Sequence, residues 1–457
     1  MAALPRFDVL IAGMGPAGIA AACAAAESGL RVAAVDDNPR EGGQIWRGES
    51  LRPASKHAAG WIARFRAARI EVLPQTRIFD APEPGVLCVE REDGFAELRY
   101  QKLILATGAR ERFLPFPGWT LPNVMGAGGL QALVKGGLPI AGKRVVVAGS
   151  GPLLLAVAAY LRKRGAIVPL IAEQAPWDRL AHFGLAISGD PSKLLQGIAL
   201  KWSLRGVPYL AGCWPVEAFG RDRITEVALT RAGGAWREPC DYLACGFGLV
   251  PNLELPLLLG CEVRSCVVAT DELQQTSLSG IYCAGEPNGI GGVDLALLEG
   301  QIAGYAAAGL STHAARLFHR RDSAARLRPA LDRAFALRDE LRALAKPETI
   351  VCRCEDVALG RMKPHAGWRP AKLQTRCGMG PCQGRICGPS VEFLLGWKQE
   401  SVRPPIFPVK FDYLARSARG ADSTSRLLER PEESAAQSPR PALPHSPDRS
   451  TPTAEKR

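Results

Sequence analysis

The sequence predicts an α/β protein that contains two dinucleotide-binding units and a small cysteine-rich domain near its C-terminus. Three observations predict this organisation. A glycine-rich turn at residues 13–18 follows a short apolar stretch, and a second such turn lies at residues 149–154. Five of the 13 cysteines fall within residues 352–387. An apolar strand, a glycine turn and a helix in succession are typical of a parallel sheet that binds a dinucleotide, so the first two observations indicate two such sheets.

Composition narrows the class of protein. The chain has 457 residues, enough for two or three domains, and its 47% hydrophobic and 22% charged residues are those of an ordinary globular protein. A formal net charge of +12 would suit nucleic acid or a membrane surface. The arginines are spread along the chain, however, and no basic run is interleaved with aromatic residues, so we expect no nucleic-acid binding. A solvated basic surface explains the charge, and a docking face for an acidic partner protein is the alternative.

One stretch approaches the length of a membrane span. Residues 9–26 are 18 positions without a charged side chain. Three glycines and a proline interrupt them, and the basic region that opens a signal peptide is missing. We therefore expect no membrane span and a cytoplasmic protein.

The first turn has all the parts of a dinucleotide site. Residues 7–12 read as a buried strand, residues 16–28 as an alanine-rich helix and residues 31–35 as the next strand. Glycines allow a tight turn and let the backbone approach a pyrophosphate, the helix N-terminus offers N–H groups, and an acid about 20 residues further on binds ribose hydroxyls. The candidate cofactor residues of this turn and strand end are Gly13, Gly15, Pro16, Ala17, Gly18 and Asp36.

Three further stretches resemble the motifs of flavoproteins with two dinucleotide-binding domains. They are a Gly-Gly pair after the acidic strand end, Lys102-Leu-Ile-Leu-Ala-Thr-Gly, and Gly280-Ile-Tyr-Cys-Ala-Gly-Glu, where glutamate replaces the usual aspartate. The resemblance implies an FAD-binding domain split into residues 1–115 and 266–310 around an inserted NAD(P)-binding-like domain, residues 116–265. The chain has no redox Cys-x4-Cys near the Gly-Gly pair, unlike disulfide reductases of the glutathione reductase type. The residues that the resemblance places beside the flavin are Gly43, Gln44, Thr107, Gly108, Gly285 and Glu286.

The second turn departs from the dinucleotide pattern at two positions. The residues around it again read as strand, turn, helix and strand. Leu154 stands where the third glycine is expected, and Ala172 stands at the position that aligns with Asp36, with Glu173 one residue later. We therefore expect the fold of an NAD(P)-binding domain, while the incomplete pattern argues against NAD(P) binding.

The cysteine-rich region has the composition of a metal centre. It holds the Cys-x-Cys pair Cys352 and Cys354, then Cys377, and then the Cys-x4-Cys pair Cys382 and Cys387. Without a secretory signal, a disulfide framework is disfavoured. Zinc sites usually have Cys-x2-Cys spacing, whereas iron–sulfur clusters are held by four cysteines at spacings that differ between families. The spacing favours an iron–sulfur cluster, with zinc as the alternative.

The same region resembles a known domain. Cys-Arg-Cys-Glu-Asp-Val and Thr-Arg-Cys-Gly-Met-Gly-Pro-Cys-Gln-Gly-Arg-Ile-Cys are similar to the bacterioferritin-associated-ferredoxin-like [2Fe-2S] domain. That domain ends the alpha subunits of opine oxidases, hydroxyproline dehydrogenases and hydrogen cyanide synthase. The resemblance implies a [2Fe-2S] domain over residues 348–400, in which Cys377 is a spare thiol that could still substitute. Arg376 and Arg385 would place positive charge beside the cluster. The implied ligands are Cys352, Cys354, Cys382 and Cys387.

The resemblance also implies a function. In those complexes a separate beta subunit, which is a flavoprotein of the amino-acid oxidase type, oxidises an amine. The alpha subunit receives its electrons and passes them towards a respiratory acceptor. Further expectations of the resemblance are FMN at the subunit interface and a small third subunit. The sequence itself shows no nucleophile–base arrangement, paired carboxylates or catalytic cysteine pair. It leaves the substrate open among opines, glycine, hydroxyproline and related amines.

Two other functions stay open. Gly149 and Gly151 would suit a self-contained reductase that takes electrons from NAD(P)H. A zinc-bearing structural or regulatory protein with a vestigial nucleotide fold would also carry these motifs.

The remaining segments carry no recognised chemistry. Residues 311–347 read as a helical connector, residues 401–419 as an extended strap, and residues 420–457, which are rich in Ser, Pro, Arg and Glu, as a disordered tail. Residues 314–345 and 404–409 are candidate surfaces for a partner protein.

Overall fold

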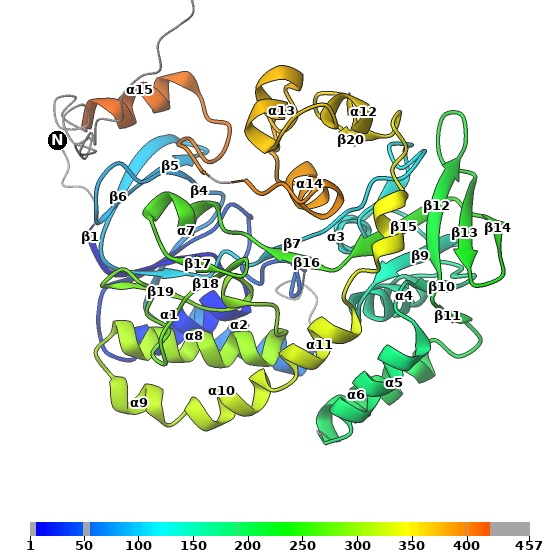
Figure 1. Cartoon of the computed structure of the whole chain (residues 1–457). Helices are drawn as coiled ribbons and strands as arrows, with labels where there is room; N and C mark the ends of the chain where they lie inside the picture. The colour runs from blue at the N-terminus through cyan, green and yellow to red at the C-terminus, as the bar shows by residue number, and fades with distance from the viewer. Residues whose placement is uncertain (1–5, 49–54, 190, 400, 421–457) are drawn as a thin grey trace, which may run out of the picture.

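The computed structural model describes residues 6–48, 55–189, 191–399 and 401–420. Two open α/β units lie side by side, and the small cysteine-rich domain lies over the junction between them (Figure 1). The predicted α/β class, with two dinucleotide-binding units and a C-terminal cysteine-rich domain, is confirmed. The predicted disordered tail lies outside the described residues, apart from Gly420.

The first sheet is built from two distant parts of the chain. Its parallel strands are β3, β2, β1, β6 and β19, and β4 and β5 extend it as an antiparallel hairpin on the first half of β6. Because β19 pairs with the end of β6, the loops that follow these two strands emerge at the same edge. The strand order is β3 (Ile70–Leu73), β2 (Val32–Val35), β1 (Arg6–Ala12), β6 (Gly94–Leu105), β5 (Val86–Arg91) and β4 (Arg77–Asp80), with β19 (Ile281–Cys283) beside β6.

Two helices from opposite ends of this unit pack very closely on one face of the sheet. They are α1 (Pro16–Ala26) and α8 (Val293–Ala307), and α2 (Lys56–Ala67) lies beside α1. A Cβ atom on Gly300 would stand only 2.2 Å from the carbonyl oxygen of Ala17, and seven of the 11 residues of α1 are alanine. Small residues on both helices therefore allow the backbones to approach, which fixes the start of α1 against α8.

The second sheet is wholly parallel and carries its own core. A three-stranded antiparallel sheet packs beside it, made of β12 (Trp214–Phe219), β13 (Glu226–Arg231) and β14 (Gly234–Pro239). Helices α3 (Ala127–Lys135) and α4 (Leu153–Lys163) cover one face, and the hairpin of α5 (Trp177–Ile187) and α6 (Pro191–Ser203) extends away from the body (Figure 1). The strand order is β11 (Tyr209–Ala211), β10 (Ile171–Glu173), β9 (Val145–Ser150), β15 (Tyr242–Phe247) and β8 (Val124–Met125).

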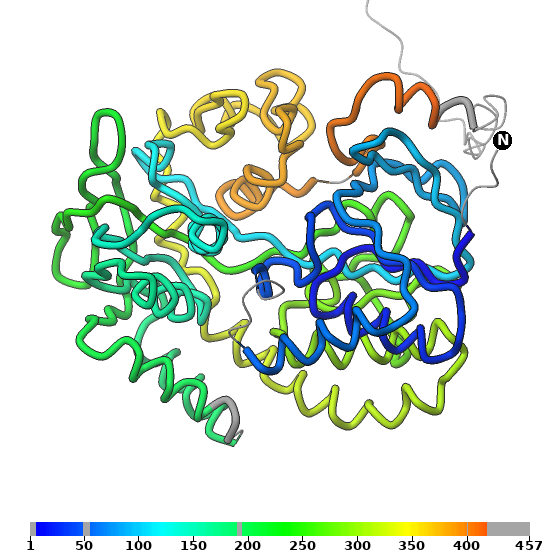
Figure 2. The backbone as a smooth tube through the Cα atoms, turned by 180° about the vertical axis from the view of Figure 1, so that it is seen from behind, coloured from blue at the N-terminus to red at the C-terminus, as the bar shows by residue number. Residues whose placement is uncertain are grey.

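A two-stranded ribbon joins the units. Strand β7 (Ala109–Glu111) leaves the first sheet and β16 (Leu249–Pro251) returns to it, and the two pair in antiparallel fashion. The view from behind shows this crossing between the two bodies (Figure 2). After it the chain forms α7 (Glu254–Leu259) and the small hairpin of β17 (Val263–Arg264) and β18 (Val267–Val268).

The connector is a series of short helices that runs from the first unit to the second. It comprises α9 (Ser311–Ala315), α10 (Phe318–Ala325), α11 (Arg328–Ala334) and the 3-10 helix η2 (Asp339–Ala343). Helices α9 and α10 lie along α8, while Leu341 and Leu344 are buried in the core of the second unit. The end of the connector is therefore part of the second unit.

The cysteine-rich domain is small and largely helical. It contains β20 (Ile350–Cys352), β21 (Val357–Ala358), α12 (Leu359–Met362), α13 (Trp368–Thr375) and α14 (Cys387–Leu395). The chain then runs back to the first unit, where the Ile406 N–H donates to the Phe79 carbonyl (2.8 Å).

The prediction of an extended strap over residues 401–419 is wrong for its second half, which forms helix α15 (Phe411–Gly420). No proline follows Pro408 in this stretch, and an ion pair one turn apart, Asp412–Arg416 at 3.3 Å, supports the helix. Ser417 anchors it by donating to the buried Asp80 carboxylate (2.7 Å).

Among the described residues, no helix is both long enough and apolar enough to cross a membrane, in line with the expectation of no membrane span.

Candidate functional site

The first glycine turn joins β1 to α1 and leaves an open cradle. A Cβ atom on Gly13 would stand 2.3 Å from the Ala106 carbonyl oxygen, and one on Gly18 would stand 1.8 Å from the Gly13 carbonyl oxygen. These two positions accept only glycine because backbone packs against them. A Cβ atom on Gly15 would meet nothing within 4 Å. The open space therefore lies at Gly15, where the helix begins with Pro16 and its first N–H groups have no partner within the helix.

Asp36 directly follows β2, at the edge of the sheet where this turn lies. Its carboxylate accepts hydrogen bonds from the Met14 N–H (2.6 Å) and from the Asn38 backbone and side-chain N–H groups (2.8 and 2.7 Å). The side chain is half-buried, so it is oriented by the protein and still reaches the surface. A carboxylate in this position suits the hydroxyls of a ribose.

Three other predicted segments converge on the same turn. A Cβ atom on Gly43 would stand 2.9 Å from the Gly15 Cα, and one on Gly285 would stand 2.9 Å from the Ala17 Cβ. The Thr107 N–H lies 3.5 Å from a Cβ position on Gly13. The structure thus brings glycine-rich loops from four places in the chain to one edge of the sheet.

The remaining predicted residues lie around this group. Gly108 has a positive φ of 68° directly after Thr107, and Glu286 opens a 3-10 helix directly after Gly285. Burial raises the pKa of the Glu286 carboxyl. Gln44 is exposed and accepts hydrogen bonds from Arg47 (3.0 and 3.3 Å).

Two residues that the sequence analysis missed hold the Gly285 loop. Glu299 on α8 is 1% exposed, accepts from the Gly285 N–H (2.8 Å) and pairs with Arg328 of the connector (2.8 Å). Arg328 also donates to the carbonyls of Asn288 (3.2 Å) and Gly289 (2.8 Å). Burial raises the pKa of Glu299 to about 7, which the Arg328 charge opposes. The sequence signal for Glu299 is its position as the single acid of an apolar run, Leu-Ala-Leu-Leu-Glu-Gly, because a charged residue in such a run is seldom buried without a partner.

The acid of the second turn is Glu173, and its alignment in the sequence analysis is wrong. In the first unit Val35 pairs with Ala12, which places Asp36 beside Gly13. In the second unit Ala172 pairs with Ala148 and Glu173 with Gly149. Glu173 therefore occupies the position of Asp36. The second unit, like the first, has an acid beside the first glycine of its turn.

This acid is buried, unlike Asp36. Glu173 is 0% exposed, and its two carboxylate oxygens accept from the N–H groups of Gly151 (2.8 Å) and Ala175 (2.9 Å). Burial raises its pKa to about 7, and those hydrogen bonds oppose the shift. The second acid thus faces its own turn and not the solvent.

Residues 335–338 of the connector cover the second turn. Ser150 within the turn donates to the Phe335 carbonyl (3.3 Å), and the buried Gln174 side chain donates to Ser150 Oγ (2.9 Å) and the Ala336 carbonyl (3.3 Å). The Arg338 N–H donates back to Gln174 Oε1 (3.2 Å). Gly149, Ser150 and Gly151 are all buried as a result, whereas Gly13 and Gly15 are partly exposed.

Three cysteines of the C-terminal domain lie within reach of a single metal centre. The Sγ atoms of Cys352, Cys377 and Cys387, all buried, lie within 4.8 Å of one another. Cys382 contacts Cys387, and the exposed Cys354 contacts Cys382. The structure therefore gathers all five cysteines, and Cys377, which was predicted to be a spare thiol, belongs to the closest group.

The environment of these thiols favours thiolates at two of them. Contacts with Cys377 and Cys387 hold the pKa of Cys352 well below its ordinary value, and contact with Cys387 lowers the pKa of Cys382 to about 5. Thiolates are the form that binds metal ions. The cysteine cluster could therefore bind a metal centre.

The cysteine domain is fixed to the junction of the two units. Trp119 Nε1 donates to the Ile350 carbonyl (2.6 Å), and Ser390 Oγ donates to the Phe113 carbonyl. Both Phe113 and Trp119 follow the ribbon strand β7. The domain therefore docks through partly buried hydrogen bonds and is not a freely tethered module.

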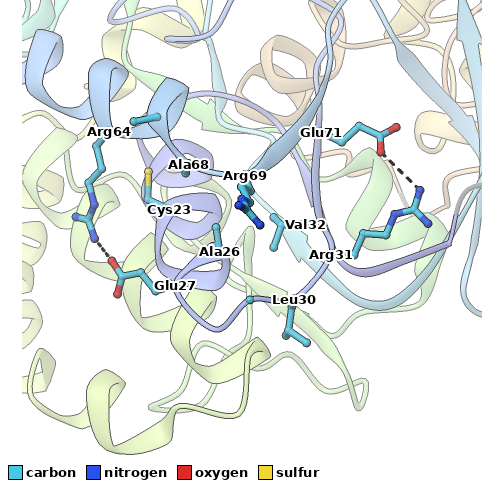
Figure 3. Close-up of a pocket in the computed structure, with 12 residues that line it drawn as sticks. Cys23, Ala26, Glu27, Leu30, Arg31, Val32, Arg64, Ala68, Arg69 and Glu71 are labelled. Atoms are coloured by element: carbon cyan, nitrogen blue, oxygen red, sulfur yellow. Dashed lines mark hydrogen bonds and ion pairs between the residues drawn. The ribbon is translucent and has the colours of Figure 1, made fainter.

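A pocket of about 600 Å³ opens elsewhere, at the far end of α1 (Figure 3). Two ion pairs line it, Arg64–Glu27 and Arg31–Glu71 (3.7 Å). It lies where β2 and β3 begin, whereas ligands of open parallel sheets bind where strands end. This pocket is therefore not the candidate dinucleotide site.

Comparisons with known proteins agree with this geometry. The family model for pyridine nucleotide-disulphide oxidoreductases matches residues 7–300. An opine oxidase component of Rhizobium meliloti (strain 1021), its "A" subunit, is 32% identical over 454 residues, covering 90% of this chain and 98% of the relative. Hydrogen cyanide synthase subunit HcnB of Pseudomonas aeruginosa is 32% identical over 426 residues, covering 83% of this chain and 90% of the relative.

A solved structure shows the same fold. The L-proline dehydrogenase from P. horikoshii matches with a TM-score of 0.67 at 21% identity, covering 91% of this chain and 81% of that one. The chain therefore belongs to the pyridine nucleotide-disulphide oxidoreductase family, and it is of the same subunit type as HcnB and its opine oxidase counterpart.

Proposed function

We propose that the chain is the FAD- and [2Fe-2S]-binding electron-transfer subunit of a heteromeric amine or amino-acid dehydrogenase. It would receive electrons from a substrate-oxidising flavoprotein partner and pass them towards a respiratory acceptor. The names of its relatives, subunits of an opine oxidase and of hydrogen cyanide synthase, support a role within a complex.

One observation carries the proposal. An open glycine turn and a cluster of five cysteines are held at the same junction, while the second turn is covered by the chain itself. The loop of Thr107 leads directly into β7, and Arg110 on β7 donates to the Arg385 carbonyl in the cysteine loop (3.0 Å), so the first turn and the cysteine cluster are connected through one ribbon. This arrangement suits transfer of electrons between two bound groups.

The residues of the first turn fit FAD. Gly15 leaves room for a pyrophosphate, the start of α1 offers N–H groups, and Asp36 is oriented for a ribose. When bound, FAD accepts two electrons and can release them singly to a one-electron centre. The protein's part is to hold the dinucleotide and, through Glu299 and Arg328, to fix the Gly285 loop beside it.

The cysteines fit a cluster with four thiolate ligands. We keep Cys352, Cys354, Cys382 and Cys387 as the proposed ligands, because the resemblance to the [2Fe-2S] domain implies them, and Cys377 as a fifth thiol within reach. FMN at a subunit interface remains part of the proposal.

Metal and flavin analysis tests the cofactors. Purified without oxygen, the chain should be brown and contain about two irons and two sulfides, together with FAD that is released on denaturation. Cys382→Ser should lose the iron and sulfide, and Cys377→Ser should keep them. Stoichiometric zinc without iron would refute the cluster.

Co-expression tests the role in a complex. Alone, the chain should show no turnover of glycine, opines, proline or hydroxyproline with an artificial electron acceptor. With an amino-acid-oxidase-like flavoprotein from the same genome, it should co-purify and support turnover of one of these substrates. Strong substrate-dependent dye reduction by this chain alone would contradict the proposal.

The alternative is a self-contained reductase that uses NAD(P)H. The register of Glu173 favours it, because the second unit then has both glycines and acid. The cover of residues 335–338 over the second turn argues against a reductase that uses NAD(P)H. A nicotinamide assay, described below, separates the two.

A further inference from the structure

A compact ionic network joins the cysteine loop to the ribbon beside the first turn. Arg110 on β7 donates to the Glu254 carboxylate (2.8 Å) and to the Asn252 side-chain oxygen (2.8 Å). Its Nε donates to the carbonyl of Arg385, which stands between Cys382 and Cys387 (3.0 Å). One side chain thus contacts both the ribbon and the cysteine loop.

Arg385 closes the network from the other side. Its Nε lies 3.6 Å from the same Glu254 oxygen, and its Nη1 donates to the Cys382 carbonyl (3.4 Å). Its guanidinium also stacks on the Phe407 ring, 3.9 Å from the ring centre. The side chains of Arg110, Glu254 and Arg385 are only 21%, 18% and 14% exposed, so water screens their charges weakly.

The network continues to the first turn. Asn252, which Arg110 orients, donates from Nδ2 to the Thr107 carbonyl (2.8 Å) and accepts from Thr107 Oγ1 at its own carbonyl (2.9 Å). Thr107 is one of the predicted flavin residues. A continuous path of hydrogen bonds and ion pairs therefore runs from the flavin loop to a predicted cluster ligand.

The charges of the network do not cancel. Two guanidinium groups share the single carboxylate of Glu254, and Arg77 lies over the same Phe407 ring as Arg385, so positive charge is in excess beside Cys382. Arg376, which directly precedes Cys377, is in a different setting. Arg376 is two-thirds exposed, so water screens its guanidinium, which pairs with Glu355 at 2.8 Å.

We propose that Arg110, Glu254 and Arg385 are the positioning residues of the flavin–cluster junction, and that Arg385 makes the cluster easier to reduce. This inference rests on the proposed function. Arg110 and Glu254 would hold the cysteine loop against the flavin loop. The uncompensated charge of Arg385 would stabilise the more negative, reduced form of a cluster held by Cys382 and Cys387.

The test is the reduction potential of the cluster, followed by its EPR signal at a series of solution potentials in the full chain. Arg385→Gln should lower the ratio of reduced to oxidised cluster at a fixed potential by about tenfold, which for a one-electron couple is about 59 mV. Arg385→Lys keeps the charge and should restore most of the ratio. Glu254→Gln leaves both arginines and should shift the ratio the other way.

Arg376→Gln is the matched control, because it removes an arginine of the same region whose charge is exposed and screened by water. It should shift the potential much less than Arg385→Gln does. Iron and FAD content are measured in every variant. If Arg385→Gln loses its iron, the reduction potential of Glu254→Gln tests the inference in its place. Equal potentials in the unmodified chain, in Glu254→Gln and in iron-containing Arg385→Gln would overturn this inference and leave the proposed function standing. Zinc in place of iron in the unmodified chain would overturn the proposed function as well.

Discussion

The two glycine turns of this chain have the same local architecture and opposite accessibility. In both, a parallel strand enters the turn, a helix leaves it, and an acid of the next strand stands beside the first glycine. The first turn is open at Gly15, while the second is buried under residues 335–338 of the connector. The second unit therefore keeps the fold of a dinucleotide-binding domain, while residues 335–338 of the same chain cover its turn.

The covering segment satisfies the polar groups that a dinucleotide would otherwise contact. Buried hydroxyl, amide and carboxylate groups need partners, since an unpaired one lowers stability. Ser150 donates to a connector carbonyl, Gln174 bonds to the connector at both ends of its amide, and Glu173 is held by backbone N–H groups. These contacts within the chain thus stabilise the second unit at the place where a bound dinucleotide would otherwise do so.

The largest expected effect comes from blocking the open turn. Gly15→Val places a branched side chain in the open part of the cradle, at a φ of −75° that valine tolerates, so FAD should be absent from the purified variant. Flavin released on denaturation measures this. On the covered turn, Gly151→Ala should keep full FAD content, with some loss of stability because φ is +109° there.

Iron content and thermal unfolding show whether the Gly15 variant is folded. A folded Gly15→Val chain with normal FAD would mean that the flavin binds elsewhere, and equal FAD loss in the Gly151 variant would mean that the two turns are not functionally distinct.

The next effect concerns nicotinamide. Because the second turn is covered, NADH and NADPH should bleach the flavin slowly or not at all, far below enzyme-like rates of about 10 per second. Stopped-flow absorbance under anaerobic conditions measures this. Rapid bleaching would favour the reductase and would require residues 335–338 to move.

Opening the covered turn should weaken the second unit. Gln174→Ala removes one buried hydrogen bond, to Ser150, and two partly buried ones, to Ala336 and Arg338, and should lower the free energy of unfolding by about 3 kcal/mol. Hydrogen exchange of residues 335–338 should rise in the same variant. Arg179→Ala, which loses one exposed contact to the Ala336 carbonyl (3.1 Å), is the control and should change the unfolding free energy by less than about 0.5 kcal/mol. Unchanged exchange in the Gln174 variant would mean that other contacts hold the cover.

The parts of the site that could be predicted from sequence are local ones. Gly13, Gly15 and Asp36 follow from one turn and the next strand, so a short motif contains their geometry. The acid lies one position further from the first glycine in the second unit (Gly149 to Glu173) than in the first (Gly13 to Asp36), which shifted Glu173 off the expected position. Only the strand register reveals the equivalence.

The parts that could not be predicted depend on contacts between distant segments. Nothing near Ser150 in sequence indicates Phe335, and nothing near Cys382 indicates Arg110 or Glu254. The closeness of Cys377 to Cys352 also arises only when the domain folds. Sequence motifs therefore located the binding elements, whereas the accessibility and the connection of those elements follow from tertiary packing.

The smallest expected effect is a pH dependence that belongs to the covered turn. Burial raises the pKa of Glu173 to about 7 from an ordinary value of 4.5, so the folded chain holds a proton there that the unfolded chain releases. Stability is then highest below about pH 4.5 and falls as the pH rises, by about 2 kcal/mol between pH 5 and 7 from this group alone. Glu173→Gln removes the titrating group, so relative to the unmodified chain it should gain about 2 kcal/mol between pH 5 and 7, measured by denaturant unfolding. A constant difference between the two proteins over this range would show that Glu173 stays ionised, and that the second turn is less closed than its contacts indicate.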